Sequence, residues 1–224
     1  NRMIHYMAKK EHLDGKFGWF FKTVGCIRVD REIHDETAKS EAINLLKNGY
    51  VVGLFPEGTR NQIFGKEEIN KKLYELYQDK LSYKDFIKTL KNNQVCISEL
   101  NLLDKLLNDN RITLNEYKDN ALNIYPYLEK LLKDKTITKE EYASSQLLPI
   151  KFGAVSLAVK TGATIIPCAV TGKYTFKNNH LNIRFGIPFK VENVSDLEES
   201  RQKLENEIIR LKLEGIKEIK NNKI

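Results

Sequence analysis

The stretch "YVVGLFPEGTR", residues 50–60, decides the fold that this sequence predicts. Its first six letters form a nearly continuous apolar run, which is typical of a strand buried on both faces of a parallel sheet. Pro56 ends the run, because its nitrogen has no hydrogen to donate to a neighbouring strand. A carboxylate, a glycine, a hydroxyl and a guanidinium follow in Glu57, Gly58, Thr59 and Arg60. They lie at the carboxyl end of the predicted strand, where α/β sheets bind their ligands.

Patterns before this stretch predict its partners in a sheet. Residues 25–29, "GCIRV", indicate a short strand, and residues 37–48 have apolar side chains at helical spacing with Gly49 as a stop. A strand, a helix and a second buried strand predict a right-handed βαβ unit.

The α/β pattern resumes near the end of the chain. Residues 150–160 predict an apolar helix that Gly162 ends, and residues 164–170, "TIIPCAV", predict a second fully apolar strand. Residues 181–186 alternate like a half-exposed strand. An amphipathic helix is expected to begin at Ser195 with a capping box to Glu198, and to pack on the domain or on a partner.

Residues 66–146 differ from both flanks because they contain an internal repeat. "LLNDNRITLNEY" (106–117) is repeated as "LLKDKTITKEEY" (131–142), and "LYQDKLSYKDF" (76–86) is a looser third copy. Each copy contains a predicted capping box followed by an aromatic residue that we expect in the core. The boxes pair Ser82 with Asp85, Thr113 with Glu116, and Thr138 with Glu141.

We therefore expect an α/β domain, a sheet flanked by helices, formed by residues 1–65 and 147–224. An all-helical insertion of residues 66–146 separates its two parts. The chain begins at Asn1 with residues that read as the middle of a domain, so we expect the natural protein to have an N-terminal segment before them.

The charge of the chain is concentrated in these flanks. Of 37 Lys and Arg and 30 Asp and Glu in the 224 residues, residues 66–146 hold 14 of each, so the flanks carry the whole net charge of +7. Such a surface attracts nucleic acid, acidic lipid or a phosphorylated substrate. Nucleic acid is disfavoured because no recognition-helix or aromatic-sheet motif accompanies the charge.

Other classes of protein are excluded or disfavoured by simple patterns. No apolar run approaches the ~20 residues of a membrane span, and no export signal opens the chain. Three widely spaced cysteines fit reduced, buried thiols in a cytoplasmic protein. No metal-ligand spacing and no nucleotide-binding glycine loop is present, so we expect neither a metal nor a cofactor.

A second polar cluster, "GCIRVDRE" (25–32), also follows a predicted strand. Arg31 and Arg60 could therefore clamp one phosphate from two sides, since guanidinium groups bind phosphate in a planar fork. Gly58 would let the backbone approach that ligand closely. The alternative is that each cluster is an ordinary turn, with Glu57 paired only to Arg60.

The sequence resembles the glycerolipid acyltransferase family, and within it the bacterial 1-acyl-sn-glycerol-3-phosphate (lysophosphatidate) acyltransferases. The resemblance covers both flanks and leaves out the helical insertion. The matching stretches are "MAKKE" (7–11), "FGWFFKTVGCIRVDRE" (17–32), "GLFPEGTR" (53–60), "PIKFGAVSLAVKTGATIIPCAV" (149–170) and "IRFGIPF" (183–189).

The resemblance implies transfer of an acyl group from coenzyme A or acyl carrier protein to lysophosphatidic acid at the cytoplasmic face of the membrane. It implies that Arg31 and Arg60 hold the acceptor phosphate, and that Glu57, Gly58 and Thr59 shape the acceptor site. Lys9 matches a family lysine near the active centre, and Lys151 matches a basic position before a helix. Ile165, Ile166 and Pro167 match the apolar block on the acyl side.

One family motif is missing from the chain. The family's general base is a histidine in an Asn-His-x4-Asp motif, but the residues five places after His5, His12, His34 and His180 are not aspartate. We therefore expect these 224 residues to be nearly inactive, with the motif upstream in the natural protein. The alternative is a non-catalytic relative that binds lipid phosphate or recruits a partner.

The segment "KFGWFFK", residues 16–22, leaves two hypotheses open. Three phenylalanines and the only tryptophan lie between two lysines, which is typical of a segment at a membrane interface. The other hypothesis is that Phe17, Phe20 and Phe21 fill the core, with Trp19 the best candidate for lipid contact. In either case we expect peripheral association with a membrane surface.

Overall fold

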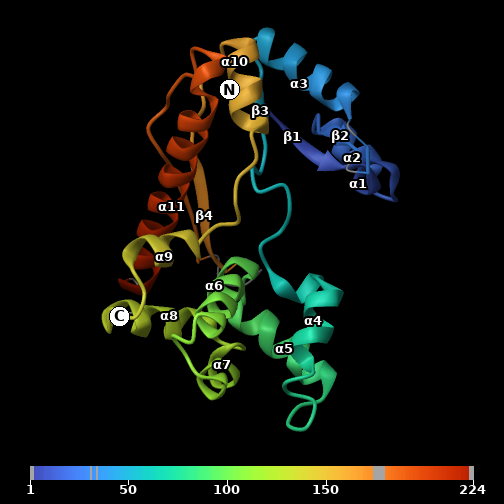
Figure 1. Cartoon of the computed structure of the whole chain (residues 1–224). Coiled ribbons are helices and arrows are strands. Elements are labelled where there is room, and N and C mark those ends of the chain that lie inside the picture. The colour runs from blue at the N-terminus through green and yellow to red at the C-terminus, as the bar shows by residue number, and fades with distance from the viewer. Residues whose placement is uncertain (1–2, 31, 34, 174–179, 222–224) are drawn as a thin grey trace. The chain divides into compact units, whose positions relative to one another are not determined.

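The computed structural model describes residues 3–30, 32–33, 35–173 and 180–221. Its contacts divide the chain into two compact units (Figure 1). The first unit comprises Asn1–Gly58 and Ile150–Ile224, and the second comprises Thr59–Pro149. The chain combines helices with a small parallel sheet, as an α/β fold requires, and the predicted domain boundaries remain a prediction.

Three parallel strands form the first sheet of unit 1. Strand β1 (Ile4–Lys9) lies between β2 (Ile27–Val29) and β3 (Val51–Gly53). Lys9 pairs with Val29 and Tyr6 pairs with Gly53. The strands predicted at 25–29 and 50–55 are confirmed but shorter, and β1 between them was not predicted.

Helix α3 (Glu36–Lys47) connects β2 to β3, as the βαβ pattern predicted. Its small residues Ala38 and Ala42 are buried with Ile27 of β2 and Leu157 of α10 (Gly153–Thr161). Gly162 ends α10 with a φ of 69°, in the left-handed conformation expected of a helix stop.

The expectation that residues 50–55 are buried on both faces was wrong. Val51–Gly53 are only half-buried, and Phe55 is 71% exposed. Val52 and Leu54 pack against the core formed with α3, so this core covers only one side of the apolar run. The strand itself ends at Gly53, before the turn that contains Pro56.

The second sheet of unit 1 is an antiparallel pair, β4 (Cys168–Lys173) and β5 (His180–Phe185). The strand predicted at 181–186 is confirmed, but the one predicted at 164–170 begins four residues late. Pro167 has no N–H for a ladder, and Ile165 makes only an isolated bridge with Phe189.

Helix α11 (Leu197–Asn221) packs against β4 and β5 after a short 3-10 turn, Val194–Asp196. The predicted capping box at its start was wrong. The Ser195 hydroxyl donates to Asp196 at 2.8 Å, while Glu198 bonds Arg201 at 2.6 Å. Ser195 lies inside the 3-10 turn and α11 begins at Leu197, so Ser195 is not at the position that caps the helix.

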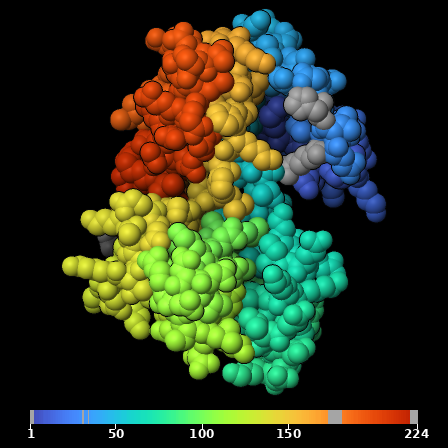
Figure 2. Space-filling model, in the orientation of Figure 1, coloured from blue at the N-terminus to red at the C-terminus, as the bar shows by residue number. Residues whose placement is uncertain are grey.

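Unit 1 is completed by two short helices that follow β1, and unit 2 is helical in the part described. The short helices are α1 (Lys10–Asp14) and α2 (Gly18–Thr23). Figure 2 shows the surface that the helices of unit 2 form, in cyan for α4 and α5 and in green to yellow for α6 to α9. The elements of unit 2 are the 3-10 turn Ile63–Gly65, α4 (Glu67–Tyr74), α5 (Tyr83–Asn93), α6 (Ile97–Asn108), α7 (Leu114–Asn120), α8 (Ile124–Lys133) and α9 (Lys139–Ser144).

The repeated sequences of unit 2 form repeated structures. The capping boxes at Thr113 and Thr138 are confirmed, whereas at Ser82 only the hydroxyl caps, and the Asp85 carboxylate accepts from that hydroxyl. The predicted core aromatics are also confirmed: Phe86, Tyr117 and Tyr142 are 0%, 6% and 8% exposed.

The two closer copies of the repeat contact each other through Arg111. Its guanidinium donates to Glu141 at 2.6 and 2.9 Å and to the carbonyl of Thr136, the residue that matches Arg111 in the second copy. Hydrogen bonding from Arg111, followed by the Thr138 amide, lowers the pKa of Glu141 to about 2. One ion pair therefore links the turns of both copies.

The packing of α11 on β4 gives the first prediction. A Cβ on Gly215 would lie 2.4 Å from Oγ1 and 3.2 Å from Cγ2 of Thr171, whose buried hydroxyl has no partner among the described residues. Gly215→Ala should lower the free energy of unfolding by about 1–3 kcal/mol, because it overpacks this contact. Thr171→Ala removes both crowding atoms, so the double variant should recover that loss. Urea unfolding of all four proteins measures the cycle, and additive effects of the two substitutions would contradict the contact.

Candidate functional site

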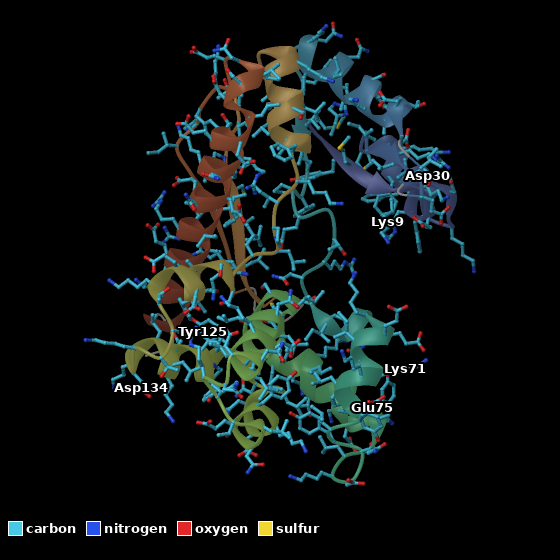
Figure 3. All side chains as sticks on the ribbon, viewed as in Figure 1. Lys9, Asp30, Lys71, Glu75, Tyr125 and Asp134 are labelled. Carbon is cyan, nitrogen blue, oxygen red and sulfur yellow. The ribbon has the colours of Figure 1, made fainter. Side chains whose placement is uncertain are left out.

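The three strands of the parallel sheet point toward one edge, where β1 and β2 end together while β3 ends level with Tyr6 of β1. Strand β1 ends at Lys9, β2 at Val29 and β3 at Gly53, and all three run in the same direction. Figure 3 labels Lys9 and Asp30 near each other at this edge, and the pairing of Lys9 with Val29 agrees with that placement. The carboxyl edge of a parallel sheet is where α/β folds place their ligands. The predicted site residues that precede unit 2 in sequence, such as Lys9 and Gly58, therefore lie at or after strand ends that point to a ligand-binding edge.

Lys10, the residue after Lys9, joins the ends of β1 and β2. Its ammonium lies 3.0 Å from Asp30 and 2.7 Å from Glu32. The hydrogen bonds that Lys10 donates to Glu32 and, second, to Asp30 raise the pKa of Lys10, and the bond from Lys10 is the largest cause that lowers the pKa of Asp30. Sequence reasoning selected Lys9, which is exposed, and missed Lys10. The available signal was the pair of adjacent lysines in "AKKE".

Asp35 fixes the segment that follows β2. Its carboxylate accepts from the backbone N–H of Asp30 at 2.8 Å and from that of Ala38 at 2.9 Å, which caps helix α3. The bond from the Asp30 amide is the largest cause that lowers the pKa of Asp35. Arg31, the predicted phosphate ligand in this segment, lies outside the described residues.

A turn follows β3 and carries the centre of the FPEGTR motif. The N–H of Gly58 donates to the carbonyl of Phe55 at 3.0 Å, with Pro56 and Glu57 at the two central positions. Proline suits the first central position because its φ is already fixed near the required value. Gly58 itself has a φ of 69°, the left-handed region that favours glycine.

Lys151 occupies the space that Gly58 leaves open. A Cβ on Gly58 would lie 3.1 Å from both Cε and Nζ of Lys151. The backbone N–H of Lys151 also donates to the carbonyl of Pro56 at 2.9 Å. The structure therefore brings together two predicted site residues that are far apart in sequence. The side chain nearest to the open side of Gly58 is that of Lys151, which is exposed and whose ammonium suits an anionic ligand.

Thr59 and Arg60 belong to unit 2. The hydroxyl of Thr59 accepts a hydrogen bond from Lys66 at 2.8 Å. Arg60 is exposed, and within the described residues of its own unit it makes no ion pair. Its guanidinium can therefore accept an anion without first losing a carboxylate partner from that unit.

The predicted acyl-side residues lie before and beside β4. Ile165 is half-buried, Ile166 is 56% exposed and Pro167 is fully buried. Ile166 belongs to a larger exposed surface, which we name the apolar β4–β5 face. Its members are Ile166, Cys168, Val170, Ile183, Phe185 and Ile187. The opposite side of this sheet carries Arg184, which bonds Glu214 and Glu218 of α11.

The described histidines are not placed as general bases. His5 is only 9% exposed, its Nδ1 lies 2.8 Å from the Gly25 carbonyl, and its ring packs edge-on against Tyr50. The alternation of β1 turns this side chain inward. His12 is exposed against Phe21. His34 lies outside the described residues, and of His180 only its backbone pairing with Lys173 is described.

The described residues contain neither a metal-binding cluster nor a membrane-spanning helix. Across residues 3–30, 32–33, 35–173 and 180–221, no group of three or more His, Cys, Asp or Glu side chains could hold a metal ion. None of the helices in the same part of the chain is both long and apolar enough to span a bilayer.

Comparison with known proteins gives one family and one relative. Residues 1–171 match the acyltransferase family. A 1-acyl-sn-glycerol-3-phosphate acyltransferase of Bacillus subtilis is 48% identical over 58 residues, which cover 25% of this chain and 29% of that protein. The chain thus spans less than a third of the length of this curated relative. No solved structure matches the chain.

The contact between Gly58 and Lys151 gives the second prediction. Gly58→Ala and Gly49→Ala should each lower the free energy of unfolding by about 1–2 kcal/mol, because both glycines have positive φ. A Cβ on Gly49 meets nothing within 4 Å, so this variant is a control for backbone strain alone. Lys151→Ala should couple to Gly58→Ala by at least about 0.5 kcal/mol and not couple to Gly49→Ala. Denaturant unfolding measures both cycles, and equal coupling would refute the contact.

Proposed function

The chain belongs to the acyltransferase family, and we propose that it serves the acylation of lysophosphatidic acid to phosphatidic acid in phospholipid biosynthesis. The single observation that supports this most is the shared edge of β1, β2 and β3. Lys9 ends β1 and Lys10 follows it, Asp30 follows β2, and the turn at Gly58 follows β3. The name of the Bacillus subtilis relative supplies the acceptor class that we propose.

The acceptor phosphate is proposed to bind cations from several segments. Arg31 and Arg60 would hold it in bidentate fashion, as the family motifs imply. Lys9 and Lys151 would add point charges, and Lys151 already lies beside Gly58. Lys10 has a different role. Because its ammonium is paired with Asp30 and Glu32, it would position the segment that contains Arg31.

The acyl donor is proposed to be a thioester of coenzyme A or acyl carrier protein. The free hydroxyl oxygen of the acceptor attacks the thioester carbonyl carbon, so that a C–O bond forms and the C–S bond breaks. A base takes the hydroxyl proton, and the sulfur leaves as a thiolate that accepts a proton to become the thiol. Glu57 would support the acceptor site at the turn, while Ile165, Ile166 and Pro167 would line the acyl side.

We propose that these 224 residues supply the acceptor site and not the general base. None of the four histidines has an aspartate five residues later, and His5 is buried against Gly25. The same observation favours a second candidate function, a non-catalytic relative that binds lipid phosphate or recruits a partner through its helical insertion. Acyl-transfer turnover by a protein that also contains the general base would support the enzyme, and its absence would support the non-catalytic relative.

The proposed place of action is the cytoplasmic face of a membrane, with peripheral attachment. Both the acceptor and the product are membrane lipids, and the net charge of +7 favours an acidic lipid surface. Nucleic acid is not a proposed partner, and no metal or cofactor is needed for the step as written.

The missing base gives the third prediction. With acyl-coenzyme A or acyl carrier protein and lysophosphatidic acid, the 224-residue chain should turn over roughly 10²- to 10⁴-fold more slowly than the Bacillus subtilis relative assayed beside it. The reason is the loss of positioned proton transfer. Release of free thiol measures the rate, and turnover equal to that of the relative would defeat the claim.

The fourth prediction concerns Arg60. Arg60→Ala should weaken binding of a short-chain lysophosphatidic acid roughly 10- to 100-fold, because it removes hydrogen bonds to a charged group. Arg60→Lys should fall between, since lysine keeps the charge and loses the planar fork. Arg210→Ala, an exposed arginine on α11, is the control. Calorimetry measures affinity, and the same loss for the phosphate-free monoacylglycerol would show that Arg60 does not bind phosphate.

A further inference from the structure

The structure decides between the two hypotheses for residues 16–22 in favour of exposure. Phe17, Trp19 and Phe20 are 70%, 67% and 49% exposed, although core aromatics would be almost fully covered. They lie at the start of helix α2, which follows α1 directly beyond the end of β1 (Figure 1). We name residues 16–22 the aromatic–lysine segment.

The packing of the α2 backbone on α1 explains why these aromatic side chains are exposed. Gly18 is the buried residue of α2, and its N–H donates to the carbonyl of Gly15 at 2.9 Å. A Cβ on Gly18 would lie only 1.9 Å from the carbonyl oxygen of Leu13, so α2 rests on α1 through its glycine. The aromatic side chains next to Gly18 are consequently turned outward.

The exposed rings form one ordered cluster. Trp19 and Phe20 pack edge to face with their centroids 6.1 Å apart, and Phe20 packs in the same way on Phe21 at 5.7 Å. Phe21 is half-buried and connects the cluster to the domain. Rigid aromatic groups lose little conformational entropy when they enter an interface.

Two lysines flank this cluster, and one exposed carboxylate, Glu11, precedes it in α1. Lys16 and Lys22 are exposed and make no ion pair within the described part of the chain. Asp14, the nearest acidic residue in sequence, is neutralised by Arg28, whose guanidinium bonds it at 2.8 Å. An anionic surface would therefore meet two unpaired ammonium groups and no free carboxylate in residues 12–23.

We propose that the aromatic–lysine segment docks the protein on an anionic lipid bilayer, with Trp19 at the depth of the headgroups. Aromatic rings prefer that depth, and lysines beside them bind acidic lipids. The proposal rests on the proposed function in that acceptor and product reside in a bilayer. Among the described residues, the apolar β4–β5 face is another exposed apolar surface, and the variants below test it separately.

The tryptophan of this segment is the only one in the chain, so it reports on its own contact. The full chain is mixed with vesicles of equimolar phosphatidylglycerol and phosphatidylcholine, with no acceptor lipid and no acyl donor. Trp19 emission should shift to shorter wavelength and be quenched by brominated lipids. Vesicles of phosphatidylcholine alone, or high salt, should weaken binding, because the lysines contribute through charge.

Matched variants locate the contact. Phe17→Ala should weaken vesicle binding about 10-fold, whereas Phe185→Ala, an equally exposed phenylalanine on β5, should leave it unchanged. Removing the charges of Lys16 and Lys22 together by Gln should weaken binding roughly 30-fold. The control removes the same charge from exposed Lys160 and Lys190 and should have a much smaller effect.

Two outcomes would overturn the proposal. One is unchanged, unquenched Trp19 emission on vesicles that have bound the protein. The other is an equal loss of binding for Phe185→Ala and Phe17→Ala, which would assign the contact to the apolar β4–β5 face. Because these vesicles hold neither substrate, either outcome leaves the proposed acyl transfer standing, and failure of the Arg60 experiment leaves the docking surface standing.

Discussion

The parallel pairing of β1 with both β2 and β3 is the constraint on which the candidate site depends. Because the three strands run in one direction, the residues that follow each of them must emerge at the same edge. Antiparallel pairing of any one strand would send its polar residues to the opposite edge. Helix α3 makes the parallel arrangement possible, since it returns the chain from the end of β2 to the start of β3.

Local interactions then hold the polar segments at that edge in defined positions. Lys10 ties the segment after β2 to the start of α1, and Asp35 ties the same segment to the first turn of α3. After β3, the positive φ and absent side chain of Gly58 leave space for Lys151. Exposed lysines from segments that are far apart in sequence thus follow the parallel strands, and we propose that they bind the phosphate of the acceptor.

Sequence patterns predicted the elements whose signals are local. Helix α3, helix α10 with its stop at Gly162, and the capping boxes at Thr113 and Thr138 depend on residues a few positions apart. The strand β1 was missed because His5 and Lys9 interrupt its apolar pattern. The imidazole of His5 is buried beside the carbonyl of Gly25, twenty residues away, which accepts its hydrogen bond.

The features of the site that sequence could not supply are tertiary. Nothing in the neighbourhood of Lys10 shows that its partners are Asp30 and Glu32 rather than a ligand. Likewise, the apolar letters of β5 do not say which side of the sheet α11 covers. Helix α11 covers the side of Arg184, so Ile183 and Phe185 remain exposed where a core was the simpler expectation.

The central claim is that the acceptor phosphate binds at the carboxyl edge of the parallel sheet. Titration of the isotope-labelled chain with glycerol 3-phosphate, followed by backbone amide NMR, tests it directly. The account predicts shifts that saturate together at Lys9, Asp30 and Gly58, with Ile4 and Val51 at the opposite edge unchanged. Shifts confined to Ile4 and Val51, or no saturable shift at the carboxyl edge, would contradict it.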